Sequence, residues 1–172
     1  MRHVISLLVE NKFGVLARVA GMFSGRGYNI ESLTVAETMD SGVSKMTIVT
    51  NGNDQVIEQI TKQLNKLVDV IKVSDLTEAD FVGRELALIK VNVENNSRSE
   101  ILSIVDIFRS KIVDVAQDGY IIEATGDEKK LAAIIELLRP FGMKEIARTG
   151  IVAMTRGVKR PQSNHKNSGG DI

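Results

Sequence analysis

The chain has 172 residues, of which 43% are hydrophobic, so it can bury one ordinary core or two small ones. Lys plus Arg and Asp plus Glu both number 22, and this balance argues against long-range attraction to nucleic acid or to an anionic membrane. The absence of Cys excludes disulfides and cysteine metal sites, and no apolar run approaches the roughly 20 residues that cross a bilayer. We therefore expect a cytoplasmic protein without a membrane segment.

The first half of the chain alternates between strand and helix patterns. A continuous apolar run, HVISLLV, predicts a buried strand, and after Gly14 apolar residues recur at helical spacing until Gly25 ends the segment. Two β-branched runs on either side of Asp40-Ser41-Gly42 predict a hairpin. The predicted order is strand, helix, strand, strand, helix, strand, over residues 3–9, 15–24, 28–36, 43–50, 54–67 and 68–73.

The second half repeats this order. Its predicted strands and helices cover residues 85–93, 98–108, 112–116, 120–124, 127–138 and 143–154. We therefore predict an α+β protein of two tandem ferredoxin-like (βαββαβ) domains, with the helices on one face of each antiparallel sheet. The domains are predicted at 1–76 and 84–157, joined by a linker at 77–83, and the polar segment 158–172 is predicted to be a disordered tail.

Asn11 and Gly14 follow the first predicted strand, and Asn29 lies at the start of the second. N–H groups at a helix N-terminus bind a carboxylate, and side-chain amide oxygens accept hydrogen bonds from an ammonium group. The second strand lies at a sheet edge in this fold, so a second copy of the chain can pair there and bring the two asparagines together. The pattern thus predicts a homodimer with a pocket for a free amino acid.

Other chemistries fit the sequence less well. His3 and His165 are the only histidines, and they are not paired at metal-ligand spacing, so we expect no metal site. RNA-binding modules of the same topology need aromatic residues on the two central strands, but 3–9 and 43–50 contain none. A phosphate hydrolase would need arginine in the loop after the first strand, where only Lys12 stands. We expect neither activity.

The segment VENKFGVLARVAGMFSGRGYNIESLTV resembles the ACT domain, a module that binds amino acids and regulates metabolic enzymes. With SKMTIVT, KQLNKLVDVIKV and ARTGIVAMTRG, the chain is similar over about residues 1–157 to the small regulatory subunits of acetolactate synthase. The resemblance implies an ACT domain at 1–76 and a subunit without its own active site. It also implies that this subunit binds and stimulates a catalytic subunit and confers feedback inhibition by valine or a related branched-chain amino acid.

The resemblance places the effector contacts on Asn11, Gly14, Asn29 and Ile30. It implies no cofactor on this chain, because thiamine diphosphate, Mg and FAD are expected on the catalytic subunit. Many ACT domains have proline before the loop glycine, whereas this chain has Phe13. An amino-acid-binding ACT regulator of another metabolic enzyme remains the alternative interpretation.

Overall fold

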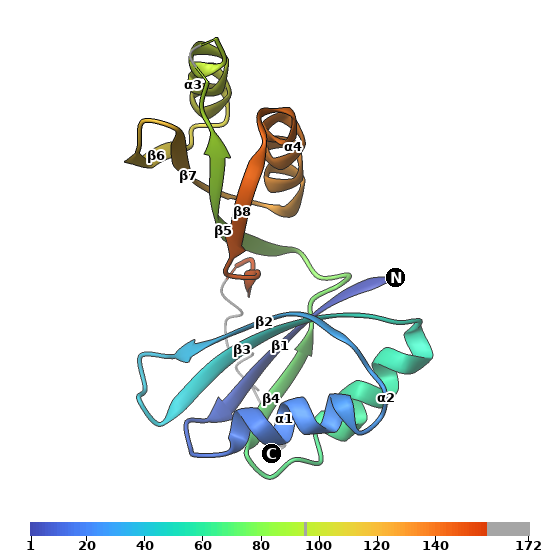
Figure 1. The fold of residues 1–172 in the computed structure, drawn as a ribbon. Coiled ribbons are helices and arrows are strands. Elements are labelled where there is room, and N and C mark those ends of the chain that lie inside the picture. Colours follow the sequence, from blue (N-terminus) through green and yellow to red (C-terminus); the bar gives the residue numbers. More distant parts are fainter. Residues whose placement is uncertain (95, 158–172) are drawn as a thin grey trace, which may run out of the picture.

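A computed structural model describes residues 1–94 and 96–157, which form two sheets that each carry two helices on one face (Figure 1). The sheet of the first domain has the strand order β2-β3-β1-β4, and all its neighbours are antiparallel. Its elements are β1 (Arg2–Glu10), α1 (Val15–Ser24), β2 (Ile30–Glu37), β3 (Val43–Asn51), α2 (Asp54–Leu64) and β4 (Val70–Asp75).

The second domain repeats this topology, with the strand order β6-β7-β5-β8 and an additional strand, β9, paired with the start of β5. Its elements are β5 (Phe81–Asn92), α3 (Arg98–Ile107), β6 (Lys111–Val115), β7 (Gly119–Gly126), α4 (Glu128–Leu138), the 3-10 turn η1 (Arg139–Phe141), β8 (Met143–Arg148) and β9 (Val152–Thr155). The predicted α+β fold with two tandem ferredoxin-like domains is confirmed.

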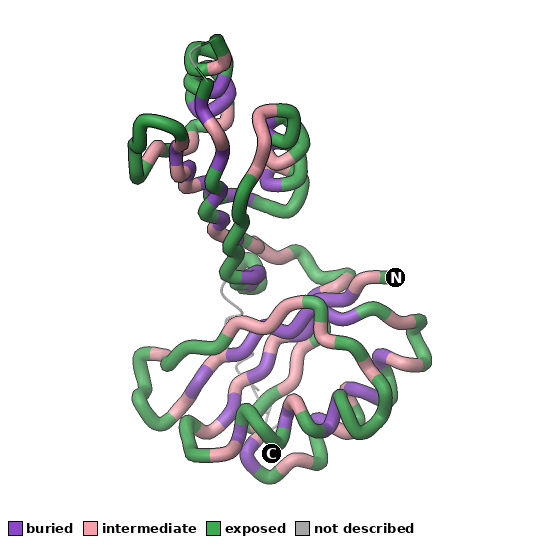
Figure 2. The backbone as a smooth tube through the Cα atoms, viewed as in Figure 1, coloured by how far each residue is buried: buried purple, intermediate pink, exposed green. Residues whose placement is uncertain are grey.

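The core of the first domain forms because β1 alternates between its two faces. Ile5, Leu7 and Val9 are fully buried and point toward the helices, where they meet apolar residues that α1 presents at helical spacing, such as Val19 and Phe23. The N-terminus of α2 is capped, because the side chain of Asn53 accepts a hydrogen bond from Val56 N. Figure 2 shows buried segments along the strands of this sheet, which lies over α1 and α2.

The second domain has a separate core of the same kind. Ile89 and Ile122, on the central strands, are fully buried against Ile101 of α3 and against Leu131 and Ile134 of α4. Each helix therefore buries one face against its own sheet, which is how a ferredoxin-like domain excludes water from its core.

The segment predicted as one strand at 143–154 is instead divided. Gly150 has a φ of +82°, a left-handed conformation that glycine adopts without steric cost, and it separates β8 from β9. β9 then pairs with Phe81–Arg84, so β5 begins before the strand start predicted at Glu85. Sequence periodicity alone did not reveal this turn, because apolar residues continue on both sides of it.

A third apolar cluster joins the domains. Ile151 and Ala153 pack against Val4, Val49 and Leu76 of the first domain, and all five are buried. Val4 alternates with Ile5 along β1, so this cluster lies on the sheet face that α1 and α2 leave open. β9 therefore covers part of that face, as Figure 1 shows between the two sheets.

The predicted disordered tail, 158–172, lies outside the described residues. Among residues 1–94 and 96–157, no helix is both long enough and apolar enough to span a membrane.

Candidate functional site

The loop between β1 and α1 is anchored to the hairpin that joins β2 and β3. Asn11 N donates to Gly42 O at 2.8 Å, and Asn11 Nδ2 donates to Ser41 O at 2.9 Å and to Glu37 Oε1 at 3.1 Å. The two side-chain bonds use both amide hydrogens of Asn11. Its Oδ1 atom can therefore accept a hydrogen bond from a ligand such as an ammonium group.

Gly14 forms the N-cap of α1, with a φ of +82° and a ψ of −6°. Glycine suits this left-handed conformation because it has no Cβ. Within residues 1–94 and 96–157 no side chain caps the helix, and its first turn carries no acidic residue. Val15 N donates to Lys12 O at 3.4 Å, whereas the N–H groups of Leu16 and Ala17 have no hydrogen-bond partner among the described residues, and together with the helix dipole they suit a carboxylate.

Basic side chains lie on either side of this helix N-terminus. Lys12 Nζ lies 2.6 Å from Glu10 Oε2, and this hydrogen bond raises the pKa of the fully exposed Lys12. Arg18 Nε lies 2.9 Å from Oδ2 of Asp69, which is buried. The backbone carbonyl of Asp69 also accepts a hydrogen bond from Glu10 N. The Arg18–Asp69 pair was not predicted, because the two residues are far apart in sequence and only the fold brings them together.

Asn29 and Ile30 lie at the opposite end of β2 from Asn11. The carbonyl of Asn29 accepts a 2.6 Å hydrogen bond from Thr50 Oγ1 near the end of β3, whereas Asn11 contacts Ser41 and Gly42 before β3 begins. β2 has 8 residues, so the two sites are separated by roughly 26 Å at about 3.3 Å per residue. The fold thus brings Asn11 next to Gly14 but separates both from Asn29 within one protomer.

The side chains of Asn29 and Ile30 differ in burial. Asn29 is exposed, whereas Ile30 is half-buried against the core of the first domain. The start of β2 thus offers an exposed amide and, one residue later, a half-buried apolar side chain, the two kinds of group that suit the polar and aliphatic parts of an amino acid.

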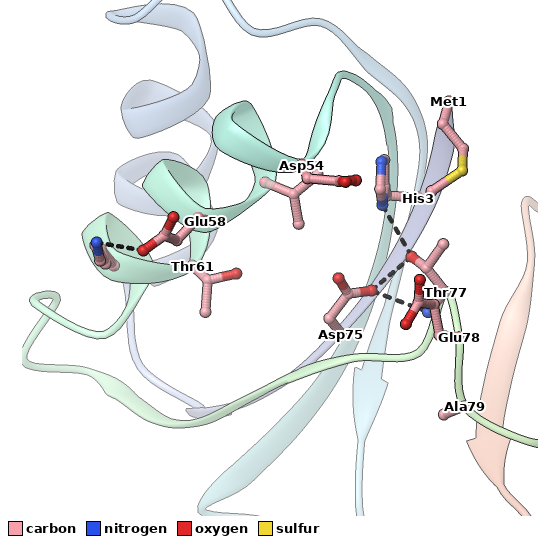
Figure 3. Close-up of a pocket in the computed structure, with 11 residues that line it drawn as sticks. Met1, His3, Asp54, Glu58, Thr61, Asp75, Thr77, Glu78 and Ala79 are labelled. Atoms are coloured by element: carbon pink, nitrogen blue, oxygen red, sulfur yellow. Dashed lines mark hydrogen bonds and ion pairs between the residues drawn. The ribbon is translucent and has the colours of Figure 1, made fainter.

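A cavity of about 670 Å³ lies near the start of β1, far from the Asn11 loop (Figure 3). His3 Nδ1 lies 3.1 Å from Thr77 Oγ1, and Asp75 Oδ1 accepts the N–H of Thr77 at 2.9 Å. Asp54, Asp75 and Glu78 give this cavity an acidic lining. The hydrogen bonds among His3, Thr77 and Asp75 connect β1 to the segment that follows β4, so these residues have a structural role.

No group of three or more His, Asp or Glu side chains that could hold a metal ion occurs in the part of the chain that the structure describes. The Asn11 loop and the Asn29 region offer amides, backbone N–H groups and basic side chains, and the carboxylates of Glu10, Glu37 and Asp69 already pair with groups in or beside the loop. These groups suit reversible binding of a small zwitterion.

Two family models match the chain, one in each domain. Residues 5–72 match the AHAS small subunit-like ACT domain, and residues 84–157 match the small subunit of acetolactate synthase. Together the two matches cover most of both ferredoxin-like domains.

Curated relatives extend the similarity over nearly the whole chain. A probable acetolactate synthase small subunit from Archaeoglobus fulgidus is 58% identical over 160 residues, which cover 93% of this chain and 100% of that protein. The acetolactate synthase small subunit of Bacillus subtilis is 48% identical over 167 residues, which cover 96% of this chain and 97% of that protein.

A solved structure agrees with these relatives. The crystal structure of the acetolactate synthase small subunit from Thermotoga maritima has a TM-score of 0.83 and 48% sequence identity, and the match covers 92% of this chain and 99% of that one.

Proposed function

Because the chain belongs to the family of acetolactate synthase small subunits, we propose that it binds the catalytic subunit of that enzyme, stimulates it, and confers feedback inhibition by valine or a related branched-chain amino acid. The observation that carries this proposal is the match to acetolactate synthase small subunits in both domains. An ACT regulator of another enzyme would share the first domain but would not be expected to match the second one.

In this proposal two chains pair through β2 to form a dimer. β2 is at the edge of its sheet, and it contains no proline that would block pairing. Two copies of β2 related by a two-fold axis run antiparallel, so the Glu37 end of one strand meets the Ile30 end of the other. Asn11 and Gly14 of one protomer then lie close to Asn29 and Ile30 of the second protomer.

The proposed effector site combines groups from both protomers. The uncapped N-terminus of α1 after Gly14 binds the effector carboxylate, and the amide oxygens of Asn11 and Asn29 accept hydrogen bonds from its ammonium group. Ile30 contacts the branched aliphatic side chain, because it is half-buried beside the site and apolar. The site binds a regulator, and the thiamine diphosphate, Mg and FAD of the reaction are held by the catalytic subunit.

The proposal keeps the division expected from the sequence, with an effector-binding and dimerising domain at 1–76, a linker at 77–83 and a second domain at 84–157, although residues 81–83 of the linker already form the start of β5 and pair with β9. The separate apolar cores of the two sheets support this division.

Two measurements test the proposal. Acetolactate formation by the catalytic subunit is measured with and without this chain, and isothermal titration measures the binding of valine, leucine and isoleucine to the chain alone. We expect stimulation by the chain and binding of at least one of the three amino acids. A catalytic subunit whose activity the folded chain leaves unchanged would contradict the proposal.

A further inference from the structure

A register shift between Ile30 and Ser32 places these two residues on opposite faces of β2, although residues two positions apart ordinarily share a face. Ile30 packs against the helix-side core. Ser32 pairs with Val49, which belongs to the buried cluster that the first domain shares with Ile151. Ser32 and Thr34 therefore face the second domain, whereas Leu33 between them packs against the helix-side core.

The turn between β8 and β9 lies directly on this face of β2. Thr34 Oγ1 donates a 2.9 Å hydrogen bond to Ile151 O. A Cβ added to Gly150 would lie 2.3 Å from Ser32 Oγ and 3.2 Å from Thr34 Oγ1. Contacts shorter than 3.0 Å do not occur for real Cβ atoms, so glycine allows the turn to approach β2 this closely.

An ion-pair chain runs beside this contact. Arg2 Nε lies 3.2 Å from Glu31 Oε2, and Arg2 Nη1 lies 2.5 Å from Glu128 Oε2 at the start of α4. Arg2 thus connects β2 with a helix of the second domain. These pairs are partly exposed, so they orient the domains more than they stabilise them.

The side of the turn that belongs to the second domain is rigidly held. Arg148 Nε and Nη2 both lie 2.7 Å from the carboxylate oxygens of Glu85, which is 7% exposed. This bidentate pair fixes the end of β8 to β5, and the hydrogen bonds that Arg148 donates to Glu85 raise the pKa of Arg148. A cavity of about 440 Å³ lined by these groups and by Ser32 leaves unfilled space between the domains.

We propose that the turn at 149–151 senses the position of β2, and that Thr34 and Gly150 are positioning residues that transmit effector binding to the second domain. The inference rests on the proposed function, because it takes Asn29 and Ile30 as effector contacts. An effector bound there restrains the start of β2, only a few residues before Ser32 and Thr34. A ligand shifts a conformational equilibrium only through contacts that differ between its states, and in this proposal the Thr34–Ile151 bond is the contact that differs.

Thr34→Val tests this inference with the whole chain reconstituted on the catalytic subunit. Valine keeps the shape and the β-branch of threonine but cannot donate to Ile151 O. We expect the dissociation constant of valine for the chain alone to stay within about twofold, because Thr34 makes no contact at the effector site. The loss of one neutral hydrogen bond should weaken coupling about 2- to 10-fold, measured as reduced maximal inhibition at saturating valine.

Two further variants control the test. Gly150→Ala forces the turn away from Ser32, so it should reduce inhibition at least as much as Thr34→Val does. Thr125→Val makes the same chemical change on an exposed part of β7 and should behave as the wild type. Thermal unfolding of each variant confirms that it is folded.

The possible outcomes separate the two claims. If the wild-type chain is inhibited by valine and both Thr34→Val and Gly150→Ala, each folded, are inhibited to the same extent, the turn does not transmit the signal. If the wild-type chain binds none of the branched-chain amino acids, the proposed function fails, and this inference fails with it.

Discussion

Replacing Gly14 with alanine tests whether the effector loop depends on a left-handed backbone conformation. A Cβ at this position would meet Arg18 Nη1 at 3.9 Å and Arg18 Cζ at 4.0 Å, which are ordinary contacts. Steric overlap therefore adds little, and the cost comes from the φ of +82°. A non-glycine residue in this region costs about 1–2 kcal/mol, so Gly14→Ala should lower the free energy of unfolding by about that amount.

Gly21→Ala is the matched control, because it makes the same change in the same helix. Gly21 lies inside α1 with no atom within 4 Å of an added Cβ. Alanine is favoured over glycine in a helix by about 1 kcal/mol, so this variant should gain stability. The free energies of unfolding of the two variants should therefore lie on opposite sides of the wild-type value and differ from each other by about 2–3 kcal/mol.

Urea unfolding at a fixed protomer concentration measures both variants, and the concentration is held constant because dimerisation contributes to apparent stability. If Gly14→Ala proved as stable as Gly21→Ala, the loop would not need the conformation on which the site depends. A titration with valine should in addition show weaker binding for Gly14→Ala and unchanged binding for Gly21→Ala.

Three further predictions concern assembly and stability. Hydrogen-bonded pairs alternate along the β2–β3 ladder, so the N–H of Val35 points away from β3 and is free to pair with a second copy of β2 in the proposed dimer. Val35→Pro removes this donor and should shift the dimer toward monomer in sedimentation at micromolar concentration. A fully dimeric variant would contradict pairing through β2. Phe23 is 1% exposed and Ile107 is 74% exposed. Phe23→Ala should therefore lower the free energy of unfolding by about 3–5 kcal/mol, whereas Ile107→Ala should change it by less than about 0.5 kcal/mol. Similar urea midpoints for the two variants would contradict this prediction. Limited proteolysis of the described part of the chain should cut first within 77–80, before β5 begins at Phe81, and a first cut inside either sheet would argue against a linker there.

The sequence predicted the strand and helix order of both domains, because each core has a clear periodicity. Ile5, Leu7 and Val9 alternate along β1, and the buried residues of α1 recur at helical spacing, so both elements could be assigned without the fold. The turn at Gly150 was not predicted, because the apolar residues after it serve the contact between domains and continue the pattern of β8.

The candidate site was predicted only in part. The sequence placed Gly14 between the first strand and the first helix, and its left-handed φ at the N-cap of α1 agrees with that position. The bonds of Asn11 to Ser41 and Glu37, and the buried partner of Arg18, depend on pairing between distant segments that one sequence does not reveal. The meeting of Asn11 with Asn29 remains a prediction, because it requires a second protomer.

The most direct test of the account is the response of the reconstituted enzyme to valine when Asn29 is replaced by alanine. The side chain of Asn29 is exposed, and its bond to Thr50 uses the backbone carbonyl, so Asn29→Ala should fold normally. Losing one charge-assisted hydrogen bond costs about 1.5–3 kcal/mol, which corresponds to roughly 10- to 150-fold weaker binding. We predict that the variant still stimulates the catalytic subunit but needs correspondingly more valine for inhibition. A folded variant with the stimulation and the valine sensitivity of the wild type would contradict the proposed site.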